Sequence, residues 1–198
     1  MARDTVELPG ATIAYEPGWL GAGEASALFA ALRAGLPWER HRITVYGRRR
    51  EAPRLSCWIG DAAYTYSGTR FEPHPWPAAL ASVRERLDAE FDAGFNSVLA
   101  NLYRDGSDRL GFHRDSEPEL GPEPLIASVS LGATRRFRLR EREGRGSFGI
   151  DLEHGSLLVM AGATQRNWLH AVPPTARPVG PRVNLTFRRV LPRLQERA

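Results

Sequence analysis

The sequence predicts one α+β domain that is mainly β, in which an antiparallel sandwich or jelly roll follows two N-terminal helices. Two helical patterns of apolar residues precede residue 95, and short strand-like segments separated by turn residues follow it. The chain has 198 residues, which is enough to bury one sizeable core. We therefore expect residues 1–198 to form a single domain.

Two segments have the apolar spacing of amphipathic helices. Residues 24–35 repeat apolar side chains at helical intervals, and the predicted helix ends near Gly35. Residues 77–93 begin with Pro77 in the first turn, carry one apolar stripe, and are expected to end at Gly94. Both apolar stripes are expected to contact the core.

Strand-like segments dominate the second half of the chain. They cover residues 97–103, 126–131, 135–140, 156–160 and 183–190, and clusters of Gly, Pro, Asp and Ser separate several of them. Several short strands with turns between them are typical of an antiparallel sandwich or jelly roll. Residues 41–71 are also expected to be extended, as an insertion between the two helices.

Composition and charge limit the class of protein. All 27 basic residues are arginine, and the net charge of +4 is compatible with a polyanionic partner, although a biased genome explains the arginine equally well. The longest apolar runs are too short to span a bilayer, and no secretory signal begins the chain. Cys57 stands alone, which excludes a disulfide framework. We expect a cytoplasmic monomer with no membrane partner.

A candidate metal site is formed by His113, Asp115 and His170. Residues i and i+2 of an extended segment point to the same side, so His113 and Asp115 can share one ion. Two imidazoles and one carboxylate form the facial triad of non-heme iron(II) oxygenases, which leaves positions open for a 2-oxo acid and dioxygen. Zinc accepts the same donors, so these ligands alone leave a zinc hydrolase open.

The segment 182–188 alternates polar and apolar residues. Strand geometry therefore places four polar side chains on one face, namely Arg182, Asn184, Thr186 and Arg188. Two cations facing a closed interior are costly without partners, whereas the same face toward solvent would be ordinary. Arginines at the two ends could each bind one carboxylate of a five-carbon diacid. Asn101 and Tyr103, two apart in another extended segment, could donate hydrogen bonds to it.

Five separated segments resemble the AlkB family of nucleic-acid dealkylases, and among its branches most resemble the one that repairs duplex DNA. They are residues 101–106, 113–117, 126–132, 154–160 and 181–188, in the family's order. The resemblance implies a double-stranded β-helix (jelly-roll) core. It divides the domain into an N-terminal helical support (1–40), an extended nucleotide-recognition lid (41–75), a helix (76–95) and the catalytic core (96–190).

The same resemblance implies the cofactors and the reaction. Fe(II) would be bound by His113, Asp115 and His170. The cosubstrate 2-oxoglutarate would be bound by Asn101, Tyr103, Arg182, Asn184 and Arg188, with Arg182 at the distal carboxylate and Arg188 nearer the iron. With O2, such an enzyme demethylates N-alkylated bases such as 1-methyladenine and 3-methylcytosine in DNA, releasing formaldehyde and succinate. The implied process is DNA repair, on single- or double-stranded alkylated DNA.

Substrate contacts are implied for a second set of residues. A base must be flipped out of a duplex to reach buried iron. The resemblance assigns base stacking to Tyr64 and Tyr66, a polar base contact to Glu117, and a wedge to Val45 and Tyr46. Separately, two groups of arginines could contact phosphates: Arg48, Arg49 and Arg50 after the wedge, and Arg136, Arg138 and Arg140 on one outward strand face. A core aromatic pair, a plain hairpin end and solvated charges are the competing interpretations.

Two other functions remain open from the sequence. The same oxygenase chemistry could act on RNA, a protein or a small molecule. A non-catalytic β-barrel that binds nucleic acid would require a broken triad or a broken arginine pair, and this sequence keeps both.

Overall fold

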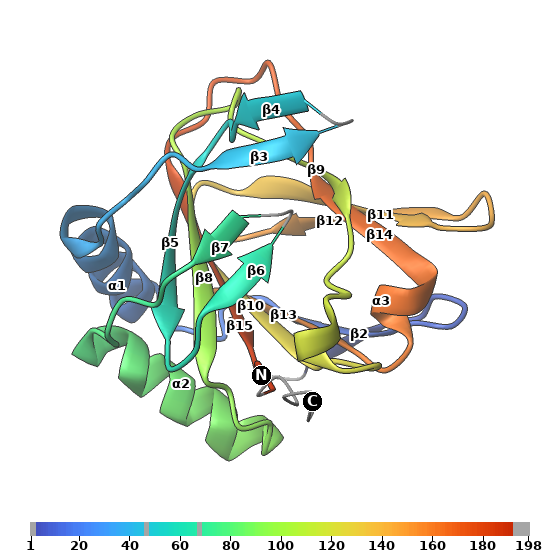
Figure 1. The fold of residues 1–198 in the computed structure, drawn as a ribbon, viewed down its shortest axis with the longest axis horizontal. Coiled ribbons are helices and arrows are strands. Elements are labelled where there is room, and N and C mark those ends of the chain that lie inside the picture. Colours follow the sequence, from blue (N-terminus) through green and yellow to red (C-terminus); the bar gives the residue numbers. More distant parts are fainter. Residues whose placement is uncertain (1–2, 46–47, 67–68, 192–198) are drawn as a thin grey trace, which may run out of the picture.

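Two antiparallel sheets face each other in the computed structural model, and two helices cover the outer face of the larger sheet (Figure 1). The structure describes residues 3–45, 48–66 and 69–191, and it describes side chains in these ranges except at 43–49 and 64–71. This arrangement is the jelly roll that the sequence predicts. A cavity lined by residues of both sheets lies between them.

The larger sheet has seven strands that come from distant parts of the chain. Their order across the sheet is β1 (Asp4–Val6), β2 (Thr12–Glu16), β13 (Ser156–Ala161), β10 (Ile126–Gly132), β15 (Arg182–Arg188), β8 (Ser97–Tyr103) and β5 (Leu55–Gly60). All neighbouring strands in this order are antiparallel. Strand β15 therefore lies inside the sheet, between β10 and β8.

The smaller sheet has four strands and carries two of the candidate metal ligands. Its order is β12 (Ser147–Leu152), β11 (Arg135–Glu141), β14 (Trp168–Val172) and β9 (Leu110–His113). A short helix α3 (Thr164–Asn167) leads into β14, and a 3-10 turn η1 (Pro118–Leu120) follows the segment after β9. Strand β9 is thus an edge strand that contacts its own sheet only through β14.

Two hairpins form most of the insertion between the helices. The first pairs β3 (Arg42–Val45) with β4 (Arg48–Glu51), and the second pairs β6 (Tyr64–Tyr66) with β7 (Thr69–Phe71). Neither hairpin joins the two larger sheets. The predicted extended character of residues 41–71 therefore takes the form of separate two-stranded ribbons and the edge strand β5.

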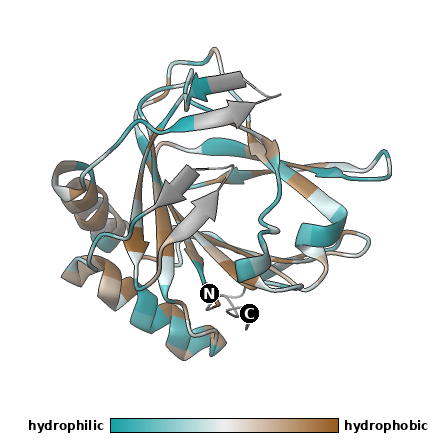
Figure 2. Ribbon diagram, in the orientation of Figure 1, coloured by the Kyte–Doolittle hydropathy of each residue, from teal (hydrophilic) through white to brown (hydrophobic). Residues whose placement is uncertain are grey.

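The helices α1 (Ala22–Gly35) and α2 (Ala78–Phe91) bury their apolar stripes against the larger sheet. Three alternate residues of β15, Val183, Leu185 and Phe187, are fully buried in this core. Figure 2 shows hydrophobic colour on the helices and on strands of this sheet, and hydrophilic colour in the surrounding loops. The apolar face of 182–188 is therefore turned to the helices, and its polar face is turned to the cavity.

Element ends differ from the prediction in two places. Helix α2 ends at Phe91 rather than at Gly94, because Asp92 adopts the left-handed conformation (φ 49°) and its N–H binds the Asp88 carbonyl. Strand β15 ends at Arg188 rather than at residue 190. The Asn96 side chain binds both backbone groups of Val190, at 2.7 and 2.8 Å, and so replaces the next pairing of the ladder.

Five short strands, β1, β2, β9, β12 and β14, lack a signal strong enough to be assigned from the sequence as separate strands. Three to six residues are too few to establish a period. None of the described helices combines the length and the apolar character that a membrane crossing requires.

Candidate metal centre and diacid pocket

Strand pairing brings the three candidate metal ligands together. His113 ends β9, His170 lies in β14, and the two residues are direct partners in the ladder. Asp115 follows His113 by two positions, and one ligand atom from each of the three residues lies within 4.8 Å of the others. Directly paired residues project to the same face of a sheet, which explains why both imidazoles point to one location.

The donor atoms of this cluster fit a cation. The His113 Nδ1 lies 2.9 Å from the Gly111 carbonyl, which can only accept, so Nε2 is the nitrogen that would coordinate an ion. Among the described residues, Asp115 Oδ1 and His170 Nδ1 are buried without a hydrogen-bond partner. Such atoms are costly unless a ligand satisfies them, and an iron or zinc ion would do so.

The ionisation states also fit metal binding. Burial, together with the nearby His113, lowers the pKa of His170 to about 3. Burial would raise the pKa of Asp115, but the charge of Arg188 and the two imidazoles outweigh it and hold this pKa at about 2. At neutral pH the histidine is therefore neutral and the carboxylate charged, the forms in which both residues coordinate metals.

Gln165 is a residue of this site that no sequence pattern indicates. Its Oε1 accepts the backbone N–H of Asp115 at 3.0 Å, and its Nε2 points to the Met160 sulfur at 3.6 Å. It is buried and lies in α3, directly before the strand that carries His170. Gln165 therefore connects the loop that holds Asp115 to the element that positions His170.

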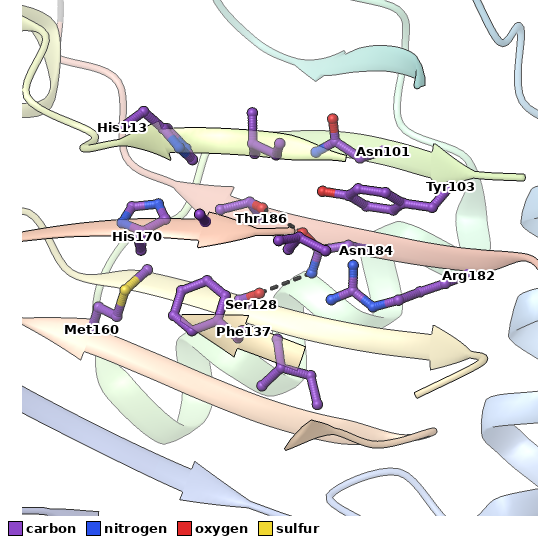
Figure 3. Close-up of a pocket in the computed structure, with 14 residues that line it drawn as sticks. Asn101, Tyr103, His113, Ser128, Phe137, Met160, His170, Arg182, Asn184 and Thr186 are labelled. Carbon is purple, nitrogen blue, oxygen red and sulfur yellow. Dashed lines mark hydrogen bonds between the residues drawn. The ribbon is translucent and has the colours of Figure 1, made fainter. Parts of the chain in front are cut away.

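A narrow cavity extends from the metal cluster between the sheets. Figure 3 shows His113 and His170 at one end and Arg182 at the other. Asn101, Asn184 and Tyr103 lie along the space between these ends. Phe137 and Met160 add apolar contacts near His170. An elongated molecule with an anionic end toward Arg182 fits this shape and this distribution of charge.

Arg182 is almost fully buried, and its hydrogen bonds are incomplete. Its Nη2 donates to Ser130 Oγ at 2.9 Å, while Nε and Nη1 have no partner among the described residues. Its guanidinium lies 5.1 Å from the centre of the Tyr103 ring, and burial lowers the pKa of Arg182. A buried cation without an anion is unfavourable, so this end of the cavity is built to receive one.

The middle of the cavity is lined by amide side chains that other residues hold in place. Asn184 Nδ2 donates to Ser128 Oγ at 2.9 Å and to the Val129 carbonyl at 3.1 Å. Asn101 Oδ1 accepts a hydrogen bond of 2.6 Å from Arg54 Nε, which leaves the Asn101 amide group for other contacts. Arg54 could not be predicted as a site residue, because nothing in its Pro-Arg context indicates burial.

Arg188 lies at the metal end of β15 but already has an anionic partner. Its Nε and Nη2 donate to Asp115 Oδ2 at 3.2 and 2.9 Å. Both side chains are buried, with exposures of 5% and 1%. Arg188 therefore lies beside the candidate metal site. Its contact is with a candidate metal ligand, a role that strand alternation alone could not indicate.

The structure describes only some of the residues that are expected to contact the substrate. Glu117 is half-buried and lies just before η1. Tyr64 and Tyr66 lie in β6, but their side chains are outside the described residues, as are those of Val45 and Arg48. Val45 pairs with Arg48 at the end of the first hairpin, and Tyr46 falls outside the described backbone.

Strand β11 alternates exposed and buried side chains. Arg136, Arg138 and Arg140 are exposed, while the alternate residues Arg135, Phe137 and Leu139 are buried. Arg136 forms an ion pair of 3.3 Å with Asp151. The predicted alternation of this strand is confirmed.

Comparisons with known proteins point to one family. The model of the 2OG-Fe(II) oxygenase superfamily matches residues 12–188. The chain is 40% identical over 186 residues to human alpha-ketoglutarate-dependent dioxygenase alkB homolog 3, a match that covers 89% of this chain and 65% of the relative. It is 40% identical over 185 residues to mouse DNA oxidative demethylase ALKBH2, covering 87% of this chain and 77% of that protein.

A solved structure shares the fold. The structure of OsALKBH1 superposes with a TM-score of 0.60 at 17% identity, covering 92% of this chain and 99% of the other. The chain thus spans almost the whole of that structure. It spans 65% of the length of the alkB homolog 3 relatives from cattle and human.

Proposed function

This chain belongs to the AlkB family within the 2OG-Fe(II) oxygenase superfamily, and from that premise we propose that it demethylates alkylated bases in DNA. The reaction would consume 2-oxoglutarate and O2 at Fe(II) and release succinate and formaldehyde. The proposed lesions are N-alkylated bases such as 1-methyladenine and 3-methylcytosine. The observation that carries the proposal is the buried Arg182, with two unsatisfied donor atoms, across one cavity from the triad.

The residues that would hold the cofactors follow from the cavity. His113, Asp115 and His170 would hold Fe(II), and Arg182 with Ser130 would bind the distal carboxylate of 2-oxoglutarate. When bound, the iron with its 2-oxo acid supplies the oxidising power that hydroxylates an N-methyl group, after which formaldehyde leaves. The chain itself orients both partners and keeps the reacting region away from bulk water.

Each polar residue of the cavity has a proposed task in that arrangement. Asn101 and Tyr103 would donate to the cosubstrate, and Asn184 would hold it from β15 while Ser128 fixes the amide. Arg188 would keep Asp115 charged and oriented, and would add positive charge near the carboxylate closer to the iron. The surrounding protein thereby selects one orientation of an asymmetric diacid.

A zinc hydrolase is the alternative that the metal ligands alone left open. A hydrolytic zinc site needs a water ligand and does not need a buried arginine at the far end of a narrow cavity. The unsatisfied donors of Arg182 therefore favour a 2-oxo diacid, and with it iron and oxygen chemistry.

The proposed partner is alkylated DNA, single or double stranded, bound by a monomer in the cytoplasm. The target base would be flipped toward the cavity. Tyr64, Tyr66 and Glu117 would then contact the base, Val45 and Tyr46 would enter the stack, and Arg48 would bind phosphate. The family membership and the basic net charge of +4 support these contacts.

The test is an oxygenase assay with defined substrates. The chain is supplied with Fe(II), 2-oxoglutarate and O2, and formaldehyde and succinate are measured with methylated single- and double-stranded oligonucleotides. We expect the amounts of formaldehyde and succinate to rise with the amount of methylated oligonucleotide supplied. Succinate without oligonucleotide-dependent formaldehyde would refute the DNA substrate, and methylated RNA, peptides and small molecules would be tried next. No succinate at all would refute the oxygenase.

A further inference from the structure

Phe112 is an aromatic side chain exposed beside the metal site. Among the described residues, Phe112 and Leu191 are the exposed large hydrophobic side chains, and 40% of Phe112 is accessible. Neighbouring residues of a strand point to opposite faces, about 3.3 Å apart along the strand. Since His113 lines the cavity, Phe112 points to the outer face of the smaller sheet.

Arg140 lies over the Phe112 ring. Its guanidinium carbon is 4.3 Å from the ring centre. Arg140 belongs to β11 and pairs with Leu169 of β14, and β14 separates β11 from β9. The arginine therefore reaches across a whole strand to contact this ring. The contact places an aromatic surface and a cation together on the outside of the sheet.

The surroundings of this pair are positively charged. Arg138 and Arg140 are exposed and form no ion pair among the described residues, whereas Arg136 on the same face is paired with Asp151. A surface that combines an aromatic ring with uncompensated arginines is complementary to a nucleotide, because the base can stack and the phosphate can bind the cation. An acidic or purely apolar protein partner would use only one of these features.

We propose that Phe112 and Arg140 form a stacking platform for an unpaired nucleotide of single-stranded DNA, next to the nucleotide that enters the cavity. This inference rests on the proposed function. Strand β9 is the edge of its sheet, so a flexible strand can pass from the cavity around that edge to the outer face. A paired base has its faces covered by its neighbours, so a duplex would not gain the stacking contact.

Binding of unmethylated oligothymidylate to the full chain tests the platform, with fluorescence anisotropy as the measurement. Phe112→Ala should weaken single-strand binding by roughly fivefold or more, since one stacked base contributes about 1–3 kcal/mol. Phe112→Trp should keep binding, because it keeps a π face. Phe112→Leu keeps the apolar bulk but not the π face, and should bind as weakly as the alanine variant.

Charge variants provide a second measurement. Arg140→Ala should weaken binding and reduce the slope of the logarithm of affinity against the logarithm of salt concentration by about one. Arg33→Ala is the matched control, because Arg33 is exposed on α1, on the far side of the larger sheet, and its loss changes the net charge equally. It should leave the slope almost unchanged.

Several results would overturn the platform. They are normal single-strand binding by Phe112→Ala, wild-type affinity in Phe112→Leu, or an equal loss on a matched duplex. Thermal unfolding of each variant shows whether the fold persists. Failure of the proposed function would look different, because the wild-type chain would then release no formaldehyde from any methylated oligonucleotide, while the binding differences would remain.

Discussion

Arg182 and Arg188 lie on the same face of the same strand, and both are buried, but they have different partners. Arg188 pairs with Asp115 at 2.9 Å, so the chain supplies its counter-ion. Arg182 contacts a serine hydroxyl and keeps two donor atoms without a partner among the described residues. The difference shows that one end of the strand is neutralised by folding, while the other end is left for a ligand to neutralise.

Removing Arg188 should therefore affect stability, whereas removing Arg182 should affect cosubstrate binding. Arg188→Met should cause the largest loss of unfolding free energy. It would leave Asp115 buried without its cation, which costs about 3–5 kcal/mol of unfolding free energy. Chemical denaturation of the metal-free chain measures this loss. An unfolding free energy equal to that of the wild type would show that Asp115 does not depend on Arg188.

Arg182→Met should leave the fold intact and weaken cosubstrate binding. Losing one partner of a buried charge pair costs roughly 2–5 kcal/mol of binding free energy. We therefore expect the 2-oxoglutarate concentration needed for half-maximal turnover to rise about 100-fold. The metal-free variant should be at least as stable as the wild type, because an unpaired buried charge has been removed. Unchanged affinity for 2-oxoglutarate would contradict the assignment of this end of the cavity.

Adding 2-oxoglutarate to the wild-type chain tests whether a ligand neutralises Arg182. A diacid that neutralises Arg182 stabilises the folded state by about 2.7 kcal/mol when present at about 100 times its dissociation constant. Thermal unfolding with Mn(II) and 2-oxoglutarate should show this shift. Arg182→Met should lose the shift at the same concentration, and 2-oxobutyrate, which lacks the distal carboxylate, should produce little shift in either protein.

Gln165→Leu should give the smallest effect, confined to the metal end. It removes the acceptor of the Asp115 N–H, and such indirect supports change metal affinity by about 10-fold. Titration with Co(II), followed by its visible absorption, measures the change. The requirement for 2-oxoglutarate at saturating metal should stay the same, and an increase there would show that Gln165 acts on the whole cavity rather than on Asp115.

Strand patterns predicted much of this site, and contacts between distant elements account for the rest. Alternation in 182–188 correctly separated the core face from the polar face, because β15 is long and regular. The different partners of Arg182 and Arg188 could not be predicted, since they depend on where Asp115 and Ser130 lie after folding. Gln165 and Arg54 were missed for the same reason, because each acts through a single long-range hydrogen bond.

The edge position of β9 affects how easily this strand separates from its sheet. Strand β9 is held to β14 through the registered pairs His113–His170 and Leu110–Val172, with an irregular register between them. Edge strands with few pairings unfold locally at low free energy and exchange their amide hydrogens quickly. An ion shared by His113 and His170 would fasten β9 to the sheet. Slow hydrogen exchange in residues 110–113 would then report metal occupancy directly, without any turnover.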